Sequence, residues 1–252
     1  MQSVHTGPAV GLLAQTLLLA ALAASVGLGA LGWTVGLVTG LFTAIALTRG
    51  LRNSGAQRLG PADWVTLARV TLIGGVAALV AQSLTAPIST MVLVALSVCA
   101  LLLDLVDGWV ARRTDTVSEL GARFDGEADA FLILVLSAYA SGIVGWWVLA
   151  IGAIRYVYLV AGWVLPWLRR RLPPRYWRKV VAAIQGIVLT VIAADVLPLV
   201  ASELLALVAL GLLGESFGRD IWWQWCRRHE PASAAIAESQ EHAPKPEVHR
   251  LG

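Results

Sequence analysis

Long apolar runs alternate with short polar segments along almost the whole chain. A helix needs about 20 apolar residues to cross a bilayer, so the shorter runs require flanking semipolar turns. The pattern predicts an all-α fold, a polytopic membrane helix bundle with about eight transmembrane helices. The runs cover residues 9–28, 31–47, 65–84, 88–103, 131–143, 146–168, 180–196 and 204–213.

The composition indicates an integral membrane protein. Of the 252 residues, 58% are hydrophobic and 14% are charged, and the mean hydropathy is +0.73. Soluble domains are far more charged. The first run has no basic region before it and a second run follows at once, so we interpret it as a retained helix and not as a signal peptide. Cys99 and Cys226 show no metal-ligand spacing and predict no disulfide.

Basic residues are concentrated in every second connection between the runs. They occur within residues 49–58, 112–123, 169–179 and 219–228, whereas the alternate connections contain no Lys or Arg. By the positive-inside rule, both termini face the cytoplasm in a multi-pass protein of the cell (plasma) membrane. Contact with anionic membrane lipids also explains these clusters, and nucleic-acid binding is not needed. All four histidines lie in the terminal segments, which disfavours chemistry that needs a buried imidazole.

Shifts in composition divide the chain into three parts. Residues 1–48 form a transmembrane hairpin without candidate chemistry, residues 49–229 form the main membrane domain, and residues 230–252 form a disordered cytoplasmic tail. Residues 62–66 predict the start of a helix with Asp63 as its N-cap. Residues 217–228 contain three tryptophans among basic residues, a composition that suits the membrane interface.

Acidic residues inside apolar sequence are the strongest indication of function. Asp104, Asp107, Asp125 and Asp129 lie at the ends of two neighbouring predicted spans, on the cytoplasmic side. One aspartate at the centre of a membrane helix costs roughly 2.5 to 3.5 kcal/mol, so four unpaired ones would cost on the order of 10 kcal/mol. A divalent cation is the simplest group that would neutralise them.

The spacing brings these acids onto two helix faces. At about 100° per residue, Asp104 and Asp107 share an arc of roughly 100°, and Asp125 and Asp129 are about 40° apart on the next helix. Carboxylates on two facing helices hold hard divalent ions, and Mg²⁺ is the most abundant candidate.

Small and basic residues beside the acids indicate phosphoryl transfer. Gly108, Ala111 and Gly121 leave room for a ligand against the backbone, and Arg112 suits a phosphate group. Metal ions beside phosphate-sized space are typical of phosphoryl transfer, in which a spare carboxylate takes the proton of the attacking hydroxyl. An ion pathway or a structural network of salt bridges is the alternative.

The segment from Asp104 to Asp129 resembles the signature of the CDP-alcohol phosphatidyltransferase family. That signature is Asp-x-x-Asp-Gly-x-x-Ala-Arg, eight residues, then Gly-x-x-x-Asp-x-x-x-Asp, and the chain matches every defined position. The resemblance extends over roughly residues 61–213, which would supply the family's six core helices. The N-terminal hairpin and the tail would then be additions.

The resemblance implies an enzyme that transfers a phosphatidyl or similar group from a CDP-linked lipid, such as CDP-diacylglycerol, to an alcohol, with release of CMP. This is a reaction of phospholipid biosynthesis, and family members typically form homodimers. The implied metal centre holds two Mg²⁺ or Mn²⁺ ions, and its ligands would be Asp104, Asp107, Asp125 and Asp129. Asp129 would also be the general base. The implied CDP site includes Gly108, Ala111, Arg112 and Gly121.

Two weaker matches flank the signature. Asp63-x-x-Thr66-x-x-Arg69 resembles the family's Asn/Asp-x-x-Thr element near the cytidine pocket; a plain N-cap with an interfacial arginine is the alternative. Lys179 and Gln185 match the Gly-Lys-x-Lys-Thr-x-x-Gln element of glycerophosphate-type members, but the glycine, second lysine and threonine are absent. That departure weakens the expectation of a glycerophosphate acceptor.

The acceptor is expected to bind near basic residues outside the signature. Arg155 lies inside a predicted span and requires a partner there. We expect it to face the cavity and bind the acceptor, with Arg123, Arg175 and Lys179 near the mouth; an ion pair with a signature aspartate is the alternative. The many cations favour a phosphorylated polyol, inositol phosphate or glycerol phosphate, over serine.

Two other functions are compatible with parts of the pattern. A divalent-cation transporter would use the carboxylates as its transport site, and it predicts acids spread over the fold. An inactive or regulatory family member is the other alternative, although the complete signature argues against it.

Overall fold

The computed structural model describes residues 6–54, 61–114, 119–169 and 176–227, and within these ranges all regular structure is helical. This confirms the all-α prediction. The elements are α1 (Thr6–Val26), α2 (Ala30–Ser54), α3 (Pro61–Ser83), α4 (Thr90–Thr114), α5 (Glu119–Val144), the 3-10 helix η1 (Trp146–Val148), α6 (Leu149–Val164), the 3-10 helix η2 (Pro166–Arg169), α7 (Tyr176–Ala193) and α8 (Leu199–Cys226).

Each predicted apolar run corresponds to one of these α-helices. Among the described residues, six helical segments are long and apolar enough to cross a membrane, and they belong to α1, α2, α3, α5, η1–α6 and α8. In α4 the apolar segment among the described residues is shorter, Thr90–Val106. The prediction of a polytopic membrane helix bundle is confirmed.

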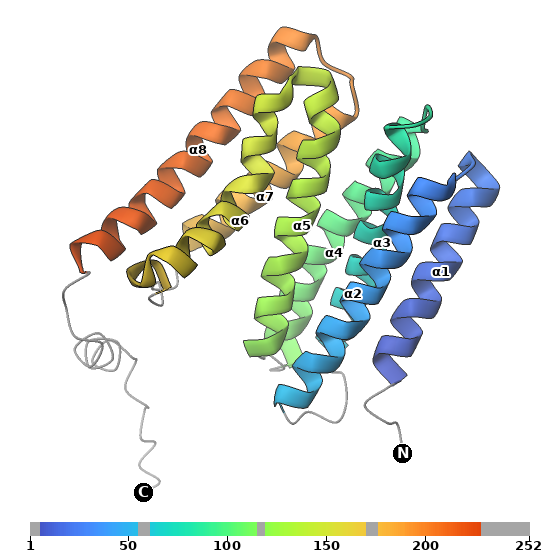
Figure 1. Ribbon diagram of the computed structural model, residues 1–252, viewed down its shortest axis with the longest axis horizontal. Coiled ribbons are helices and arrows are strands. Elements are labelled where there is room, and N and C mark those ends of the chain that lie inside the picture. Colours follow the sequence, from blue (N-terminus) through green and yellow to red (C-terminus); the bar gives the residue numbers. More distant parts are fainter. Residues whose placement is uncertain (1–5, 55–60, 115–118, 170–175, 228–252) are drawn as a thin grey trace, which may run out of the picture.

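The helices run up and down, so their ends gather at two sides of the bundle. In Figure 1, α1, α2 and α3 lie toward one end of the long axis, α5 lies in the middle, and α6 and α8 lie at the other end. α3 contacts α1, α2, α4 and α5, while α5 also contacts α6 and α7. α1 begins, α2 ends, α5 begins and α8 ends on the lower side in this view. The basic segments next to the end of α2, the start of α5 and the end of α8 thus adjoin the same side of the bundle, and their cytoplasmic location stays a prediction.

The N-terminal hairpin packs closely on α3 because α2 carries glycines at spacings of four. A Cβ added at Gly36 would lie 2.5 Å from a Leu19 methyl group and 3.2 Å from Ala78 Cβ, so no larger side chain fits without displacement. Small residues at this spacing allow membrane helices to approach one another closely. At the turn, the Gly29 backbone N–H donates to Gln82 Oε1 at 2.8 Å. The hairpin is therefore attached to α3 along its length.

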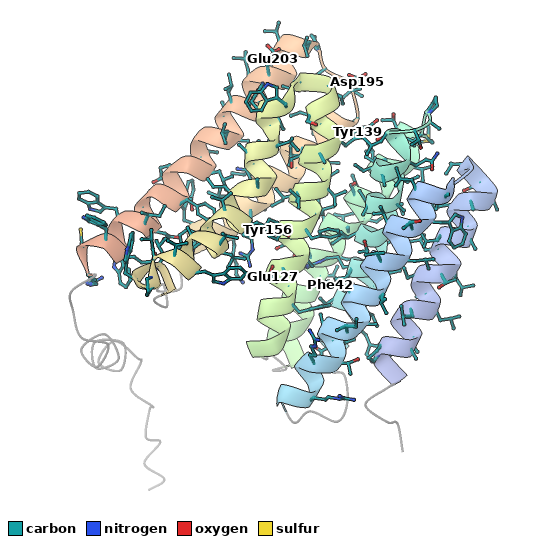
Figure 2. The ribbon with its side chains drawn as sticks, in the orientation of Figure 1. Phe42, Glu127, Tyr139, Tyr156, Asp195 and Glu203 are labelled. Carbon is teal, nitrogen blue, oxygen red and sulfur yellow. The ribbon has the colours of Figure 1, made fainter. Side chains whose placement is uncertain are left out.

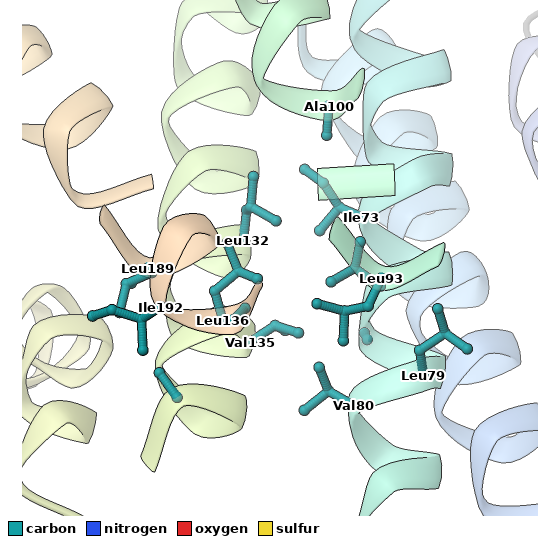
Figure 3. Packing of buried hydrophobic residues seen from close by; sticks show 14 of the residues in the cluster. Ile73, Leu79, Val80, Leu93, Ala100, Leu132, Val135, Leu136, Leu189 and Ile192 are labelled. Carbon is teal, nitrogen blue, oxygen red and sulfur yellow. The ribbon is translucent and has the colours of Figure 1, made fainter. Parts of the chain in front are cut away.

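The buried core lies between α3, α4, α5 and α7. Figure 3 shows Ile73 and Leu93 from one side meeting Leu132 and Leu136 of α5, with Leu189 of α7 beyond them. All of these side chains are nearly or fully buried. Burying apolar side chains against one another excludes lipid and fixes the spacing of α4 and α5. That spacing positions the acidic residues at the ends of the two helices.

One local prediction requires correction. Asp63 is not an N-cap, because α3 begins at Pro61 and Asp63 lies in its first turn. Proline suits the first helical position, where its missing N–H would have no partner in any case. The segment whose composition suits the membrane interface continues α8 as far as Cys226. Its Trp222 is nevertheless largely exposed, and the Arg227 guanidinium lies 4.4 Å from the centre of the Trp223 ring.

Candidate active site

Three of the four signature aspartates converge in the structure. Asp104 belongs to α4, and Asp125 and Asp129 belong to α5, one turn apart. One carboxylate oxygen from each lies within 4.8 Å of the other two. Each side chain is about one-third exposed, at 33%, 34% and 32% respectively. We call these three residues the aspartate cluster, and its position confirms that the two acidic helix faces meet.

A buried arginine of α3 lies in the middle of the aspartate cluster. Arg69 Nη1 donates to Asp104 Oδ1 at 2.5 Å and lies 2.6 Å from Asp125 Oδ1. Its Nη2 lies 3.2 Å from Asp129 Oδ1 and donates to the Asp125 carbonyl at 3.0 Å. The Arg69 side chain is only 1% exposed. One guanidinium therefore links α3 to both helices that carry the signature.

The cluster retains capacity to bind a metal ion. Asp125 Oδ1 is buried and lies 2.6 Å from Arg69 Nη1. Three carboxylates from two facing helices are the oxygen ligands that Mg²⁺ and Mn²⁺ prefer. The donor set and its spacing, with oxygens within 4.8 Å of one another, thus fit a divalent cation. Asp107 follows Asp104 by one turn of α4, and its side chain lies outside the described residues.

The predicted CDP-binding residues lie on the three helices that meet here. Thr66 is buried, with 4% exposure, and Asp63 is partly buried; both precede Arg69 at spacings of three on α3. This periodicity places them along one face of α3 toward its N-terminal end. Of the others, α4 contains Gly108, Ala111 and Arg112, and α5 contains Gly121; their side-chain surroundings are outside the described part of the structure.

Arg155 of α6 pairs with an acid that the sequence analysis did not select. Its Nη2 donates to Glu127 Oε1 at 2.6 Å, and the two side chains are 39% and 53% exposed. Figure 2 shows Glu127 and Tyr156 between α5 and α6. Arg155 also interacts electrostatically with Asp129. The alternative of a direct ion pair with a signature aspartate is therefore replaced by a pair with Glu127, beside the cluster.

The remaining predicted acceptor residues are less clearly placed. Lys179 is exposed near the start of α7. Arg123 belongs to α5 but its side chain is outside the described residues, and Arg175 lies outside them altogether. Gln185, from the weak glycerophosphate-type match, is fully buried and donates to the Ala209 carbonyl at 2.9 Å. In the described structure Gln185 therefore joins α7 to α8.

Sequence reasoning missed two charged residues of the site. Arg69 was considered only as part of a flanking motif, and Glu127 was not considered at all. A signal for both was available, since each is a charge within or beside an apolar span and needs a partner there. The same argument selected Arg155. What was missing was the packing of α3 and α6 on either side of α5.

Comparison with known proteins supports the assignment of the signature. A family model described as CDP-alcohol phosphatidyltransferase matches residues 59–216. This range contains α3 to α7 and most of α8, and it leaves α1 and α2 outside. No curated protein and no solved structure matches the chain.

Proposed function

Because the chain belongs to the CDP-alcohol phosphatidyltransferase family, we propose that it transfers a phosphatidyl group from a CDP-linked lipid, such as CDP-diacylglycerol, to an alcohol. CMP is the second product, and the reaction serves phospholipid biosynthesis. The observation that carries this proposal is the convergence of Asp104, Asp125 and Asp129, all signature residues, with oxygens within 4.8 Å of one another. These acids gather in one cluster on two helices, and this arrangement gives no support to the transporter alternative.

The proposed metal ligands are Asp104, Asp107, Asp125 and Asp129. Two Mg²⁺ or Mn²⁺ ions bound by these carboxylates would offset the negative charge of the donor diphosphate and of the departing CMP. By holding the metal ions, these aspartates would determine where the diphosphate binds, at the end of the bundle where α5 begins. Thr66 and Asp63 approach the same end from α3 and are proposed to bind the cytidine portion, with Gly108, Ala111, Arg112 and Gly121 along the nucleotide.

Asp129 is the proposed general base. It accepts the proton of the acceptor hydroxyl, whose oxygen forms a bond to the lipid-bearing phosphorus of the donor. The anhydride bond to CMP breaks in the same exchange, so CMP leaves with the bonding electron pair. A base must lie within about 3 Å of the proton that it removes, so the acceptor hydroxyl has to reach Asp129. No covalent enzyme intermediate is needed.

Arg155 is the proposed anchor for the acceptor. It lies on α6 where this helix contacts α5, is 39% exposed, and binds the Glu127 carboxylate through one nitrogen. A guanidinium in that state has further N–H groups that can donate to a phosphate. The acceptor is therefore proposed to be a phosphorylated polyol, such as inositol phosphate or glycerol phosphate, with Arg123, Arg175 and Lys179 contributing near the entrance.

The wider setting of the enzyme follows from the same reasoning. We propose a homodimer in the cell membrane, with the active site and both termini on the cytoplasmic side. The catalytic membrane domain would comprise residues 49–229, preceded by the hairpin of residues 1–48 and followed by the tail of residues 230–252. The basic connections on that side of the bundle support this orientation.

An acceptor panel tests the proposal. Purified protein is incubated with CDP-diacylglycerol, Mg²⁺ and either inositol phosphate, glycerol phosphate, inositol, glycerol or serine, and CMP is measured. We expect Mg²⁺-dependent CMP release that is fastest with a phosphorylated polyol. Release with serine alone would contradict the proposed acceptor class, and no release with any alcohol would contradict the transferase activity.

A further inference from the structure

Arg69 is a charged side chain in the most buried helix of the bundle. The residue has 0% exposure, and Val70 and Ile73 beside it on α3 are also buried. A buried charge is tolerated only where partners compensate its lost solvation. The charge of Arg69 is tolerated there because of its partners. Among the described residues, its hydrogen bonds and ion pairs are with two signature residues of α5 and one of α4.

The guanidinium contacts the three aspartates through two different nitrogens. Nη1 lies between Asp104 Oδ1 at 2.5 Å and Asp125 Oδ1 at 2.6 Å, and Nη2 reaches Asp129 Oδ1 at 3.2 Å. A lysine ammonium is a single compact charge and cannot reproduce two separated nitrogens in fixed positions. The arrangement draws α4 and α5 together on the side that faces α3.

The guanidinium contacts the same three carboxylates that could hold a metal ion. Its positive charge lies 2.5 to 3.2 Å from one oxygen of each of them, so it repels a cation that binds there. The fit to arginine is incomplete, since Arg69 Nε has no hydrogen-bond partner among the described residues. The three carboxylates and the guanidinium together carry a net charge of −2, so Arg69 alone does not neutralise the cluster.

We propose that Arg69 is a positioning residue of the metal centre, and that its positive charge partly balances the aspartates when no metal ion is bound. It holds the aspartate cluster together before a metal ion binds, and it competes with that ion for the carboxylate oxygens. The inference rests on the metal centre of the proposed function. Arg69 then has two opposite effects. It raises the stability of the metal-free protein, and it weakens binding of the divalent cation.

The test compares Arg69→Gln with Arg69→Lys in the full-length protein in detergent. Binding of Mn²⁺ is measured by electron paramagnetic resonance in the absence of any nucleotide, and thermal unfolding is measured with and without Mn²⁺. Gln removes the positive charge and the two guanidinium nitrogens, whereas Lys keeps the charge but offers a single nitrogen. Neither readout depends on transferase activity.

We expect Arg69→Gln to bind Mn²⁺ at least about tenfold more tightly, because one positive charge close to the site has been removed. Its metal-free form should unfold about 5 °C or more below the wild type, and Mn²⁺ should raise its unfolding temperature by more than it raises that of the wild type. Arg69→Lys should also unfold earlier without metal, while its Mn²⁺ affinity stays near that of the wild type.

Several results would overturn the inference. Unchanged or weaker Mn²⁺ binding by Arg69→Gln would show that Arg69 does not compete with the ion. Equal Mn²⁺ affinities of the Gln and Lys variants would exclude the charge as the cause. If neither the wild type nor any Arg69 variant bound Mn²⁺, the proposed metal centre would be wrong. That result differs from one in which Mn²⁺ binds but its affinity does not depend on residue 69, which would contradict only the role of Arg69.

A double variant covers the case in which Arg69→Gln does not fold. Arg69→Gln combined with Asp104→Asn removes one charge of each sign, so it leaves fewer unpaired carboxylates. We expect it to recover folded, metal-free protein relative to Arg69→Gln. A double variant no more stable than the single one would contradict the role of Arg69 as counter-cation of these acids.

Discussion

Two arginines inside the apolar body of this protein have opposite environments. Arg69 on α3 is fully buried and contacts three aspartates, whereas Arg155 on α6 is 39% exposed and binds one glutamate. Both lie beside α5, the first on the side of α3 and the second on the side of α6. α5 therefore separates a buried charge cluster from an accessible ion pair.

The difference indicates how the two charges can be used. Removing one partner of a buried ion pair leaves an uncompensated charge, so the contacts of Arg69 are needed for the stability of the structure. An exposed pair such as Arg155–Glu127 contributes little to stability and can exchange its partner for a ligand. The first arginine is thus suited to organising the metal centre, and the second to binding an acceptor.

The largest expected effect is on stability. Arg69→Ala should lower the free energy of unfolding of the metal-free protein by about 3 to 5 kcal/mol, the range for breaking a buried ion pair. Arg155→Ala should lower it by no more than about 1 kcal/mol. Unfolding of both variants in detergent, followed by circular dichroism, checks the comparison. Equal losses would remove the distinction between the two arginines.

A smaller effect is expected on acceptor binding. Arg155→Ala should raise the KM for the phosphorylated acceptor about 10- to 100-fold, because a charge-assisted hydrogen bond to phosphate is lost. The KM for CDP-diacylglycerol should stay unchanged, since Arg155 is not among the proposed donor contacts. Steady-state CMP release at varied concentrations of each substrate measures both. An unchanged acceptor KM with normal donor binding would contradict the acceptor role of Arg155.

The smallest effect concerns the partner of Arg155. Glu127→Gln removes the carboxylate that competes with an acceptor phosphate for the guanidinium, so the acceptor KM should fall about two- to fivefold. The effect should weaken at high ionic strength, because a half-exposed pair is screened by salt. The acceptor KM of Glu127→Gln and wild type at low and high salt checks this. A rise in KM would mean that Glu127 itself binds the acceptor.

The sequence was sufficient for the helices and for the aspartate cluster. Apolar length located all eight α-helices of the described residues, and the spacing of Asp104, Asp125 and Asp129 placed them on faces that do meet. These features depend on local periodicity, which a single sequence displays. The start of α3 was misplaced because Asp63 is a strong N-cap residue, and the effect of Pro61 at the first helical position was not considered.

The charges between helices could not be predicted in the same way. Arg69 precedes Asp104 by 35 residues and Asp125 by 56, so their contact depends on how α3 packs against α4 and α5. Arg155 was expected to need a partner, but the helical position of Glu127 alone did not identify it. Partner choice among several charges is a property of tertiary packing, and the periodicity of one helix does not contain it.

The aspartate cluster is proposed to perform CDP-dependent transfer, with Asp129 as its base. This proposal is tested by measuring CMP release from CDP-diacylglycerol by Asp129→Asn, with Glu203→Gln as a matched acid-to-amide control at the opposite end of the bundle (Figure 2). We predict that Asp129→Asn loses at least about 1000-fold in kcat, because it lacks both a base and a metal ligand, while Glu203→Gln keeps the wild-type rate. CMP release by Asp129→Asn at a rate near that of the control would contradict the account.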